Sequence, residues 1–290
     1  MNGIIVLDKP QGKTSHDMIN FMRRMTGIRR IGHTGTLDPM ATGVLPVCVG
    51  NATKVADMLT LSDKGYCAEF VLGITTDTED ISGNILSRCD VSVSREEIQN
   101  AIMSFVGEIE QIPPMYSAIK QNGKKLYELA RQGIETEREK RRVTINSIDI
   151  LDIDTEKFTA KINVICSKGT YIRTLCSDIG KKLGTGACMT SLRRTLTGPF
   201  TLDDAYTCTD IENNIDKLSD MLMPVDKMFS EYMPIYLNEK QKKSIVNGVR
   251  MTWRDGVEGQ CYRVYDENNT FLCISRCVDG KLHLEKSFWN

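Results

Sequence analysis

The chain has 290 residues, of which 41% are hydrophobic and 26% are charged, and its formal net charge is −1. This length and composition predict a folded globular protein with one large or two ordinary domains. The near-neutral charge excludes a protein that coats nucleic acid through bulk basicity, although residues 120–142 are locally basic, with eight Lys/Arg against four acids.

No apolar run approaches the ~20 residues that cross a bilayer, and the N-terminal apolar stretch at 3–7 is followed at once by Asp8. We therefore expect no membrane span, no signal peptide and a cytoplasmic location. The ten cysteines are scattered, and even the closest candidate ligands, Cys273 and Cys277, lie in a segment that alternates like a strand. Reduced structural thiols and no bound metal are the better interpretation.

Hydrophobic periodicity predicts alternating strands and helices along the first 200 residues. Strands are expected at 3–7, 44–49, 66–74 and 158–166. Helices with capping residues at or near their first positions are expected at 15–25, 51–61, 94–105 and 170–183. Because strands outnumber strand–helix–strand units, we predict an α+β fold, with a mixed, mainly antiparallel sheet flanked by helices.

The acidic stretch 203–231 is interpreted as a helical connection at the end of a larger domain, residues 1–232. After it, Asn238 can cap a short helix that ends at Gly248. Three short strands are expected at 261–265, 270–275 and 281–286. Residues 233–290 are therefore predicted to form a small β-rich domain.

Residues 33–47 are the segment most densely filled with residues that shape the backbone. They hold two glycines, two prolines and three threonines, which is too broken for a helix and too interrupted for a central strand. An ordered loop is expected, and such loops often carry function. This one presents a single carboxylate, Asp38, before Pro39. The alternative is an aspartate that only forms a turn before proline. The many residues that restrict the backbone of this segment favour a functional site instead.

Two further residues stand out by position. Tyr66 begins a strand, where it is either a half-buried strand aromatic or a residue that stacks on a base. Arg173 lies in the first turn of its predicted helix, where a cation is electrostatically disfavoured. We therefore expect an acidic partner for Arg173, either a surface glutamate or a buried carboxylate such as Asp38.

Six sets of residues, in order across residues 3–200, resemble the TruB family of tRNA pseudouridine synthases. The matching segments are 7–15, 32–46, 64–66 with 72–73, 113–120, 166–175, and 192–195 with Gly198. The resemblance implies a pseudouridine synthase core in which residues 120–142 are an insertion that clamps the T-stem of tRNA. It also implies that residues 233–290 are a PUA-like RNA-binding domain. A solvated helix and loop, and a domain that only caps the sheet, are the respective alternatives.

By this resemblance, the reaction is isomerisation of uridine 55 in the T-loop of tRNA, after the uridine is flipped out of the loop. The bond between ribose C1′ and uracil N1 breaks, the base turns, and it rejoins through C5. Neither a metal nor an organic cofactor is implied. The implied partner is tRNA, with no obligatory protein partner, and a monomer is expected.

The resemblance also implies the catalytic residues. Asp38 matches the essential aspartate, which attacks C1′ or assists proton removal from the sugar. Arg173 matches the cation that keeps this carboxylate ionised, which is needed because burial alone raises the pKa of a carboxyl group. Tyr66 matches the tyrosine that stacks on the flipped uracil and takes the C5 proton.

Four further residues are predicted to bind the substrate. Tyr171 and Leu192 match residues that line the uracil pocket, although Leu192 alone would be interpreted as core. His33 matches a histidine that contacts the rearranged RNA bases, where a lone histidine is usually structural. Lys9, at the exit from the first strand, is expected to pack beneath the loop of Asp38.

Two other classes of function compete with this enzyme. A non-catalytic RNA-binding or RNA-folding protein could use the same surface, but the intact set of Asp38, Tyr66 and Arg173 counts against it. A glycoside hydrolase also breaks a glycosidic bond, but such enzymes use two carboxylates ~5–10 Å apart. The loop offers only Asp38, since Asp8 belongs to the preceding turn.

Overall fold

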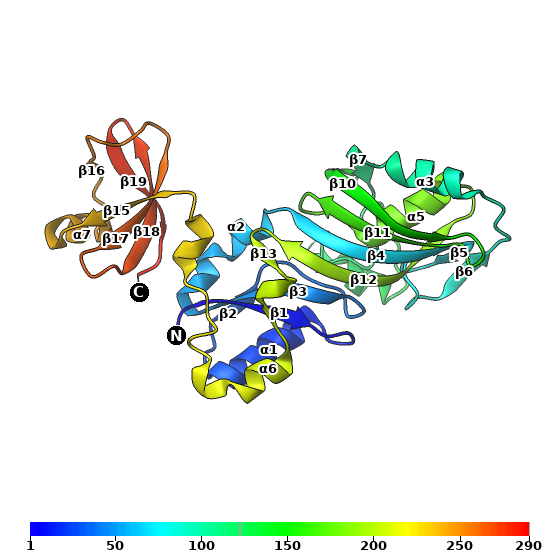
Figure 1. Ribbon diagram of the computed structural model, residues 1–290, viewed down its shortest axis with the longest axis horizontal. Helices are drawn as coiled ribbons and strands as arrows, with labels where there is room; N and C mark the ends of the chain where they lie inside the picture. The colour runs from blue at the N-terminus through cyan, green and yellow to red at the C-terminus, as the bar shows by residue number, and fades with distance from the viewer. Residues whose placement is uncertain (122, 290) are drawn as a thin grey trace.

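The computed structural model describes residues 1–121 and 123–289 (Figure 1). Within these residues, the main sheet has ten strands and runs in the order β14-β1-β3-β12-β4-β11-β10-β7, with β13 paired to β12 and β2 paired to β3. Neighbouring strands are antiparallel except for β1 with β14 and β3 with β12. The predicted α+β class and the mixed, mainly antiparallel sheet are confirmed.

The bounds of the elements in the larger part of the chain are as follows. The strands of the main sheet are β1 (Gly3–Lys9), β2 (Ile31–His33), β3 (Thr42–Val49), β4 (Lys64–Leu72), β7 (Gly107–Gln111), β10 (Arg141–Asp154), β11 (Thr159–Cys166), β12 (Ala187–Thr197), β13 (Phe200–Thr201) and β14 (Ala205–Tyr206). Two small hairpins pair β5 (Ile74–Thr76) with β6 (Ile85–Arg88), and β8 (Lys120–Gln121) with β9 (Lys124–Lys125). The helices are α1 (Ser15–Thr26), η1 (Gly50–Val55), α2 (Ala56–Thr60), α3 (Arg95–Met103), α4 (Leu126–Ala130), α5 (Ile172–Lys182) and α6 (Cys208–Asn213).

Two of the predicted helices, α1 and α3, begin at their predicted capping residues. Thr14 and Ser94 each accept a hydrogen bond from the backbone amide three residues on and complete a capping box, which satisfies amides that the first turn leaves free. The prediction of a helix at 51–61 is wrong for its first half, because residues 50–55 form the 3₁₀ turn η1. There the Asn51 amide group donates to the carbonyl of Phe288 in the C-terminal domain instead of capping a helix.

Period-two alternation along β1 divides the core into two layers. Ile5 and Leu7 pack with α1, α3, α5 and α6 on one face of the sheet. Ile4 and Val6 face the other side, where they pack with η1, α2 and apolar side chains of the C-terminal part, including Phe288. In Figure 1, α1 and α6 lie side by side under β1, and α3 and α5 cover the other end of the sheet.

The connection 203–231 is less helical than predicted. Besides α6 it holds three 3₁₀ turns, η2 (Leu202–Asp204), η3 (Ile215–Lys217) and η4 (Val225–Phe229). It also adds β14 to the edge of the main sheet, in parallel with β1. Short segments of this kind follow the sheet edge, which periodicity alone does not reveal.

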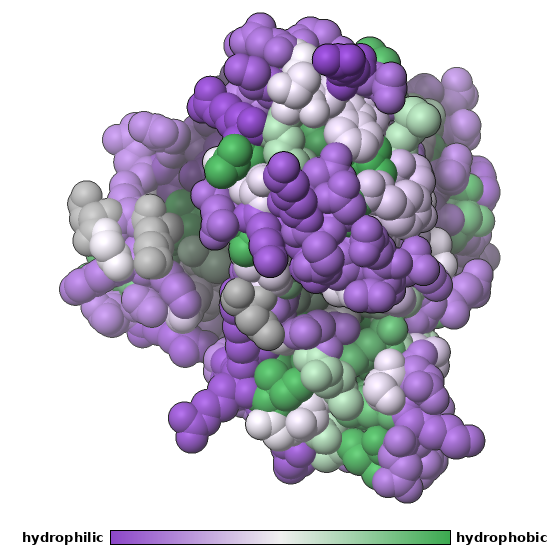
Figure 2. All heavy atoms as spheres, turned by 90° about the vertical axis from the view of Figure 1, so that its left-hand side faces the viewer, coloured by the Kyte–Doolittle hydropathy of each residue, from purple (hydrophilic) through white to green (hydrophobic). Residues whose placement is uncertain are grey.

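The C-terminal residues form a five-stranded sheet in the order β15-β17-β18-β19-β16, with one helix against it. Its elements are β15 (Met233–Leu237), α7 (Glu239–Val246), β16 (Met251–Thr252), β17 (Cys261–Asp266), β18 (Phe271–Val278) and β19 (Lys281–Ser287). The three predicted strands are β17, β18 and β19, while β15 and β16 were missed. The side of the molecule that carries this sheet is mostly hydrophilic, with smaller apolar areas (Figure 2). No helix among the described residues is long and apolar enough to cross a membrane.

Candidate active site

The loop between β2 and β3 holds Asp38 in a fixed position. The Ser15 hydroxyl at the start of α1 accepts a hydrogen bond from the Leu37 amide at 2.8 Å and donates to the Leu37 carbonyl at 3.2 Å. On the other side, the Ala41 amide donates to the Asp38 carbonyl at 3.0 Å. Leu37 is buried, whereas the Asp38 side chain keeps 34% of its exposure. The backbone is therefore anchored on both sides of a carboxylate that remains open to a substrate.

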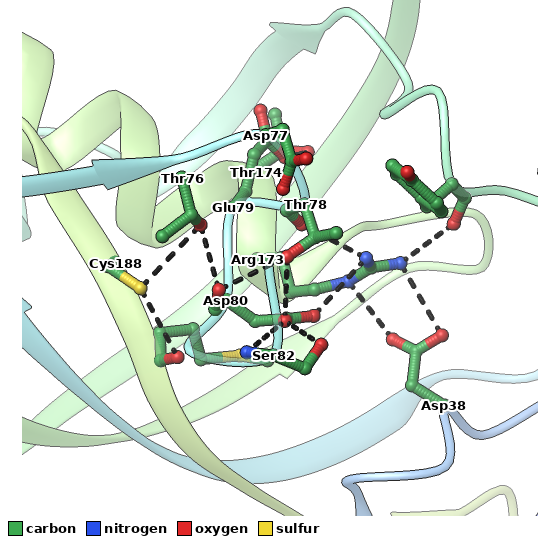
Figure 3. Close-up of polar contacts among 12 residues, drawn as sticks. Asp38, Thr76, Asp77, Thr78, Glu79, Asp80, Ser82, Arg173, Thr174 and Cys188 are labelled. Carbon is green, nitrogen blue, oxygen red and sulfur yellow. Dashed lines mark hydrogen bonds and ion pairs between the residues drawn. The ribbon is translucent and has the colours of Figure 1, made fainter. Parts of the chain in front are cut away.

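The acidic partner predicted for Arg173 is Asp38. Arg173 Nε lies 3.0 Å from Asp38 Oδ2, and Nη2 lies 3.4 Å from Oδ1, so the guanidinium meets the carboxylate with two nitrogens (Figure 3). This fork geometry fixes orientation as well as charge. The Arg173 side chain is only 5% exposed, and it reaches the loop from the first turn of α5.

A second carboxylate, Asp80, lies on the other side of Arg173. Its Oδ2 is 3.4 Å from Arg173 Nη1, and its Oδ1 accepts hydrogen bonds from the Thr78 hydroxyl at 2.8 Å and the Ser82 amide at 2.9 Å. Arg173 also donates to the carbonyls of Thr78 at 3.1 Å and Tyr116 at 3.0 Å. The guanidinium is thus held from several directions, which is the preorganisation that a catalytic carboxylate needs.

Sequence reasoning missed Asp80. It is buried in the turn between β5 and β6, where it bonds its own turn as well as Arg173. The available signal was a carboxylate-rich turn, residues 77–84, between two short strands. Many solvated turns look the same, so only the contact with Arg173 distinguishes it.

The electrostatics of the trio are set by burial and by one cation between two anions. Burial raises the pKa of the Asp38 carboxyl above its ordinary value, the Arg173 guanidinium lowers it, and the charge of Asp80 raises it. Arg173 therefore opposes the largest effect, and together with the smaller contribution of Lys9 it favours the ionised form of Asp38.

The residues predicted for the uracil pocket come from neighbouring elements around this carboxylate. Tyr66 in β4 is flanked by β11 and β12, and Leu192 in β12 lies opposite Ala68 of the same β4. Tyr171 precedes α5, and its backbone is fixed by the Gln111 side chain, which accepts from the Tyr171 amide at 3.0 Å and donates to its carbonyl at 3.1 Å. Asp38 is close enough to act electrostatically on both tyrosines.

Comparison with known proteins decides the family. The model of the "TruB family pseudouridylate synthase (N terminal domain)" matches residues 23–172, and that of the "tRNA pseudouridylate synthase B C-terminal domain" matches residues 173–230. The chain belongs to the TruB family. The boundary between the two matches falls within α5, and the ion pair of Asp38 with Arg173 joins the two matched regions of this TruB-family chain.

Similar proteins extend this match along the chain. A tRNA pseudouridine synthase B of Alkaliphilus oremlandii is 49% identical over 87% of this chain and 83% of its own length. One of Clostridium perfringens (strain SM101) is 44% identical over 99% of this chain and 98% of its own length. Among solved structures, a Cbf5-Nop10-Gar1 complex matches with a TM-score of 0.74 at 24% identity, covering 99% of this chain and 85% of that chain. At that identity the structural match supports the fold.

Two predicted substrate residues have clear surroundings in this TruB-family structure. His33 ends β2, and its Nδ1 accepts a hydrogen bond from the Gly35 amide at 3.3 Å, while burial lowers its pKa. Lys9 is fully buried, contrary to the expected contact with substrate. Its Nζ donates to the carbonyls of Lys13 at 2.6 Å and Pro10 at 2.9 Å, and lies 3.4 Å from that of Pro39. Lys9 therefore supports the Asp38 loop from beneath, because an ammonium bonded to three carbonyls has no donor left for RNA.

The two cysteines considered as metal ligands lie far along the chain, on β18. Burial raises the pKa of the Cys273 thiol to about 12, which disfavours the thiolate that binds metal. In the part of the chain that the structure describes, no group of three or more His, Cys, Asp or Glu side chains is placed to hold a metal ion.

Replacing Asp80 with asparagine is expected to lower the single-turnover rate about tenfold, the effect of losing one charge-assisted hydrogen bond. Because the charge of Asp80 raises the pKa of Asp38, the acidic limb of the pH–rate profile should also move to lower pH. Asp77→Asn is the matched control, since Asp77 lies in the same turn and bonds Asn84. If the two variants changed the rate and the pH profile equally, the hypothesis that Asp80 acts by holding Arg173 would be contradicted.

Proposed function

We propose that this chain isomerises uridine 55 in the T-loop of tRNA to pseudouridine. The observation that carries the proposal is the Asp38 carboxylate, which is anchored in an ordered loop and paired with two nitrogens of Arg173. The chain that presents it belongs to the TruB family. A carboxylate that is one third exposed and has a buried counter-ion suits attack on ribose C1′ or removal of a sugar proton. Membership of the family supports tRNA as the substrate.

The reaction begins when the uridine is extruded from the T-loop, at a cost of a few kcal/mol in stacking and pairing. Asp38, kept ionised by Arg173, then attacks C1′ or takes a proton from the sugar, and the C1′–N1 bond breaks. Tyr66 stacks on the detached uracil, and Tyr171 and Leu192 confine it while it turns. The base rejoins C1′ through C5, and the C5 proton passes to Tyr66.

The insertion 120–142 is proposed to clamp the T-stem. Asn122 lies outside the described residues. The rest of the insertion folds back on the segment that touches Arg173, because the Tyr127 amide donates to the Ser117 carbonyl at 3.1 Å and Arg138 Nη1 to the Pro113 carbonyl at 3.1 Å. Contact between the insertion and the T-stem would therefore lie next to the active site.

Neutralising the exposed pair Arg141 and Arg142 with glutamine should weaken tRNA binding. The rate at which bound tRNA is isomerised should stay unchanged. The slope of log affinity against log salt should fall by about 1 for each lost phosphate contact. Lys157→Gln, at the far end of the same β10–β11 hairpin, is the control for charge alone. An unchanged salt slope in the double variant would mean that this surface does not contact the backbone of the RNA.

Residues 233–290, of which Asn290 lies outside the described part, are proposed to be a PUA-like domain that extends RNA contact toward the acceptor stem, with residues 1–232 as the catalytic domain. Tyr236 supports this role, because it is 57% exposed and stacks on Tyr265 with 5.5 Å between ring centroids. An exposed aromatic face suits stacking on a base.

We also propose that the enzyme acts in the cytoplasm as a monomer, without an obligatory protein partner or cofactor. Arg173 bonds Asp38, and Asp38 acts electrostatically on Tyr66 and Tyr171, so one chain supplies this set of residues around the carboxylate. The ten cysteines are free thiols, the form that a reducing compartment maintains.

The test is an unmodified tRNA transcript that carries tritium at uracil C5, incubated with the purified protein without metal or cofactor. Isomerisation at position 55 releases the tritium of that base, and a transcript with cytidine at 55 is the matched control. A non-catalytic RNA-binding protein would retain the transcript and release no tritium. A glycosidase would liberate free uracil.

A further inference from the structure

Arg194 is a buried cation in the middle of the main sheet, and the mechanism above does not use it. It is 1% exposed, and its guanidinium donates from Nε to the Val44 carbonyl at 2.7 Å and from Nη2 to the Gly35 carbonyl at 3.2 Å. None of the ion pairs between described residues includes it. Burying a guanidinium without a carboxylate is costly, so a role beyond packing is expected.

The position of Arg194 links Tyr66 to the catalytic loop. In the antiparallel ladder of β4 and β12, Arg194 is the residue directly opposite Tyr66, so the two side chains project from the same face. The Gly35 carbonyl that it holds belongs to the turn between His33 and Asp38. The Arg194 backbone packs closely against Gly43 of β3. A Cβ atom added to Gly43 would lie only 2.1 Å from the Arg194 carbonyl oxygen, so there is no room for a side chain there. This anchoring leaves the guanidinium little freedom.

The charges around Tyr66 come from three elements. Arg194 faces it from β12, the Cys166 thiol from the end of β11, and Asp38 from the loop. Burial raises the pKa of the Tyr66 phenol, and the Arg194 cation lowers it. Burial lowers the pKa of two further lysines, Lys9 and Lys64, to about 8, and the charge of Arg194 adds to this effect in both. Arg194 is thus the cation that acts on the Tyr66 phenol, and a cation held in place favours an oxygen that bears negative charge.

We propose that Arg194 is a positioning residue, which aims the Tyr66 oxygen at uracil C5 and stabilises its phenolate form for removal of the C5 proton. This role rests on the proposed function. Once C5 has joined C1′, the C5–H bond breaks and its electrons form the C5=C6 double bond. The N1=C6 electrons then move onto N1, which takes a proton from water. The phenolate becomes a phenol and later returns its proton to solvent.

The test compares tRNA transcripts with ordinary and 5-deuterated uridine in single-turnover assays. Arg194→Gln keeps hydrogen-bond donors but loses the charge, so it should slow the reaction ~10-fold to 100-fold and make proton removal from C5 limiting. A deuterium isotope effect larger than that of the wild type should then appear. Tyr66→Phe should show the same effect, and adding Arg194→Gln to it should change little, because both act on one step.

Arg193→Gln is the matched control, since Arg193 is the neighbouring residue but is partly exposed and paired with Asp8 at 2.7 Å. It should show the isotope effect of the wild type. Arg194→Lys, which keeps the charge, should recover part of the rate. Circular dichroism checks each fold, and Arg194→Met, of similar length and apolar, replaces the glutamine variant if that variant does not fold.

An isotope effect unchanged from the wild type in the neutral Arg194 variant would overturn the proposal and leave the proposed function intact. Fully additive losses in the double variant with Tyr66→Phe would also overturn it. Absence of tritium release from C5 by the wild type would instead refute the proposed function, and this inference with it.

Discussion

Asp38→Asn is expected to lower the rate of pseudouridine formation by at least ~10³-fold, because an amide neither attacks C1′ nor accepts a proton as a carboxylate does. Binding of tRNA should persist, because asparagine has nearly the same shape as aspartate and the loop stays anchored through Ser15 and Leu37. Tritium release from C5 in single-turnover assays measures the rate, and nitrocellulose filter binding measures affinity.

Asp8→Asn is the control for this experiment. Asp8 is also a partly buried carboxylate with an arginine partner, but that partner is Arg193, outside the site. It should retain activity close to that of the wild type. Undiminished tritium release by Asp38→Asn would falsify the catalytic assignment, and equal losses in both variants would point to general damage to the fold.

The second large effect is expected for Arg173→Met, which removes the cation and leaves Asp38 and Asp80 without the charge between them. Removing one partner of a buried ion pair costs about 3–5 kcal/mol. If this whole cost raises the activation barrier, it corresponds to a rate loss of ~2 × 10²-fold to ~5 × 10³-fold. The rate loss should be partly recovered at higher pH.

The sign of the pH effect follows from the charges. Arg173 lowers the pKa of Asp38, which burial has raised, so its removal raises that pKa further. If only ionised Asp38 reacts, the acidic limb of the pH–rate profile moves to higher pH. Arg193→Met should leave the profile in place, because Arg193 lies outside the trio. A profile that stays in place in Arg173→Met would show that Arg173 does not act by keeping Asp38 ionised.

The sequence could predict Asp38 because its evidence is local. Glycine, proline and threonine restrict backbone shape within a few residues, and this restriction is visible in the order of the residues. The need of Arg173 for an acidic partner was also a local argument, from its place in the first turn of a helix. The choice of partner was not local, because Asp38 and Arg173 lie 135 residues apart in the chain.

Asp80, Arg194 and Lys9 show what local patterns could not decide. Asp80 looks like any turn carboxylate until the chain brings Arg173 against it. Arg194 looks like a strand arginine until β12 pairs with β4 on one side and β3 on the other, which removes it from water. Lys9 looks available to RNA until three carbonyls surround its ammonium. Burial and partners are properties of the packed chain.

By itself, the sequence determined most of the helices and strands, the α+β class, the family resemblance and the loop of Asp38, since periodicity, capping and turn preferences act over a few residues. Only the tertiary structure decided the order of the strands, the trio of Asp38, Arg173 and Asp80, and the burial of Arg194 opposite Tyr66. Long-range strand pairing sets these contacts, because it joins segments whose local patterns carry no record of each other.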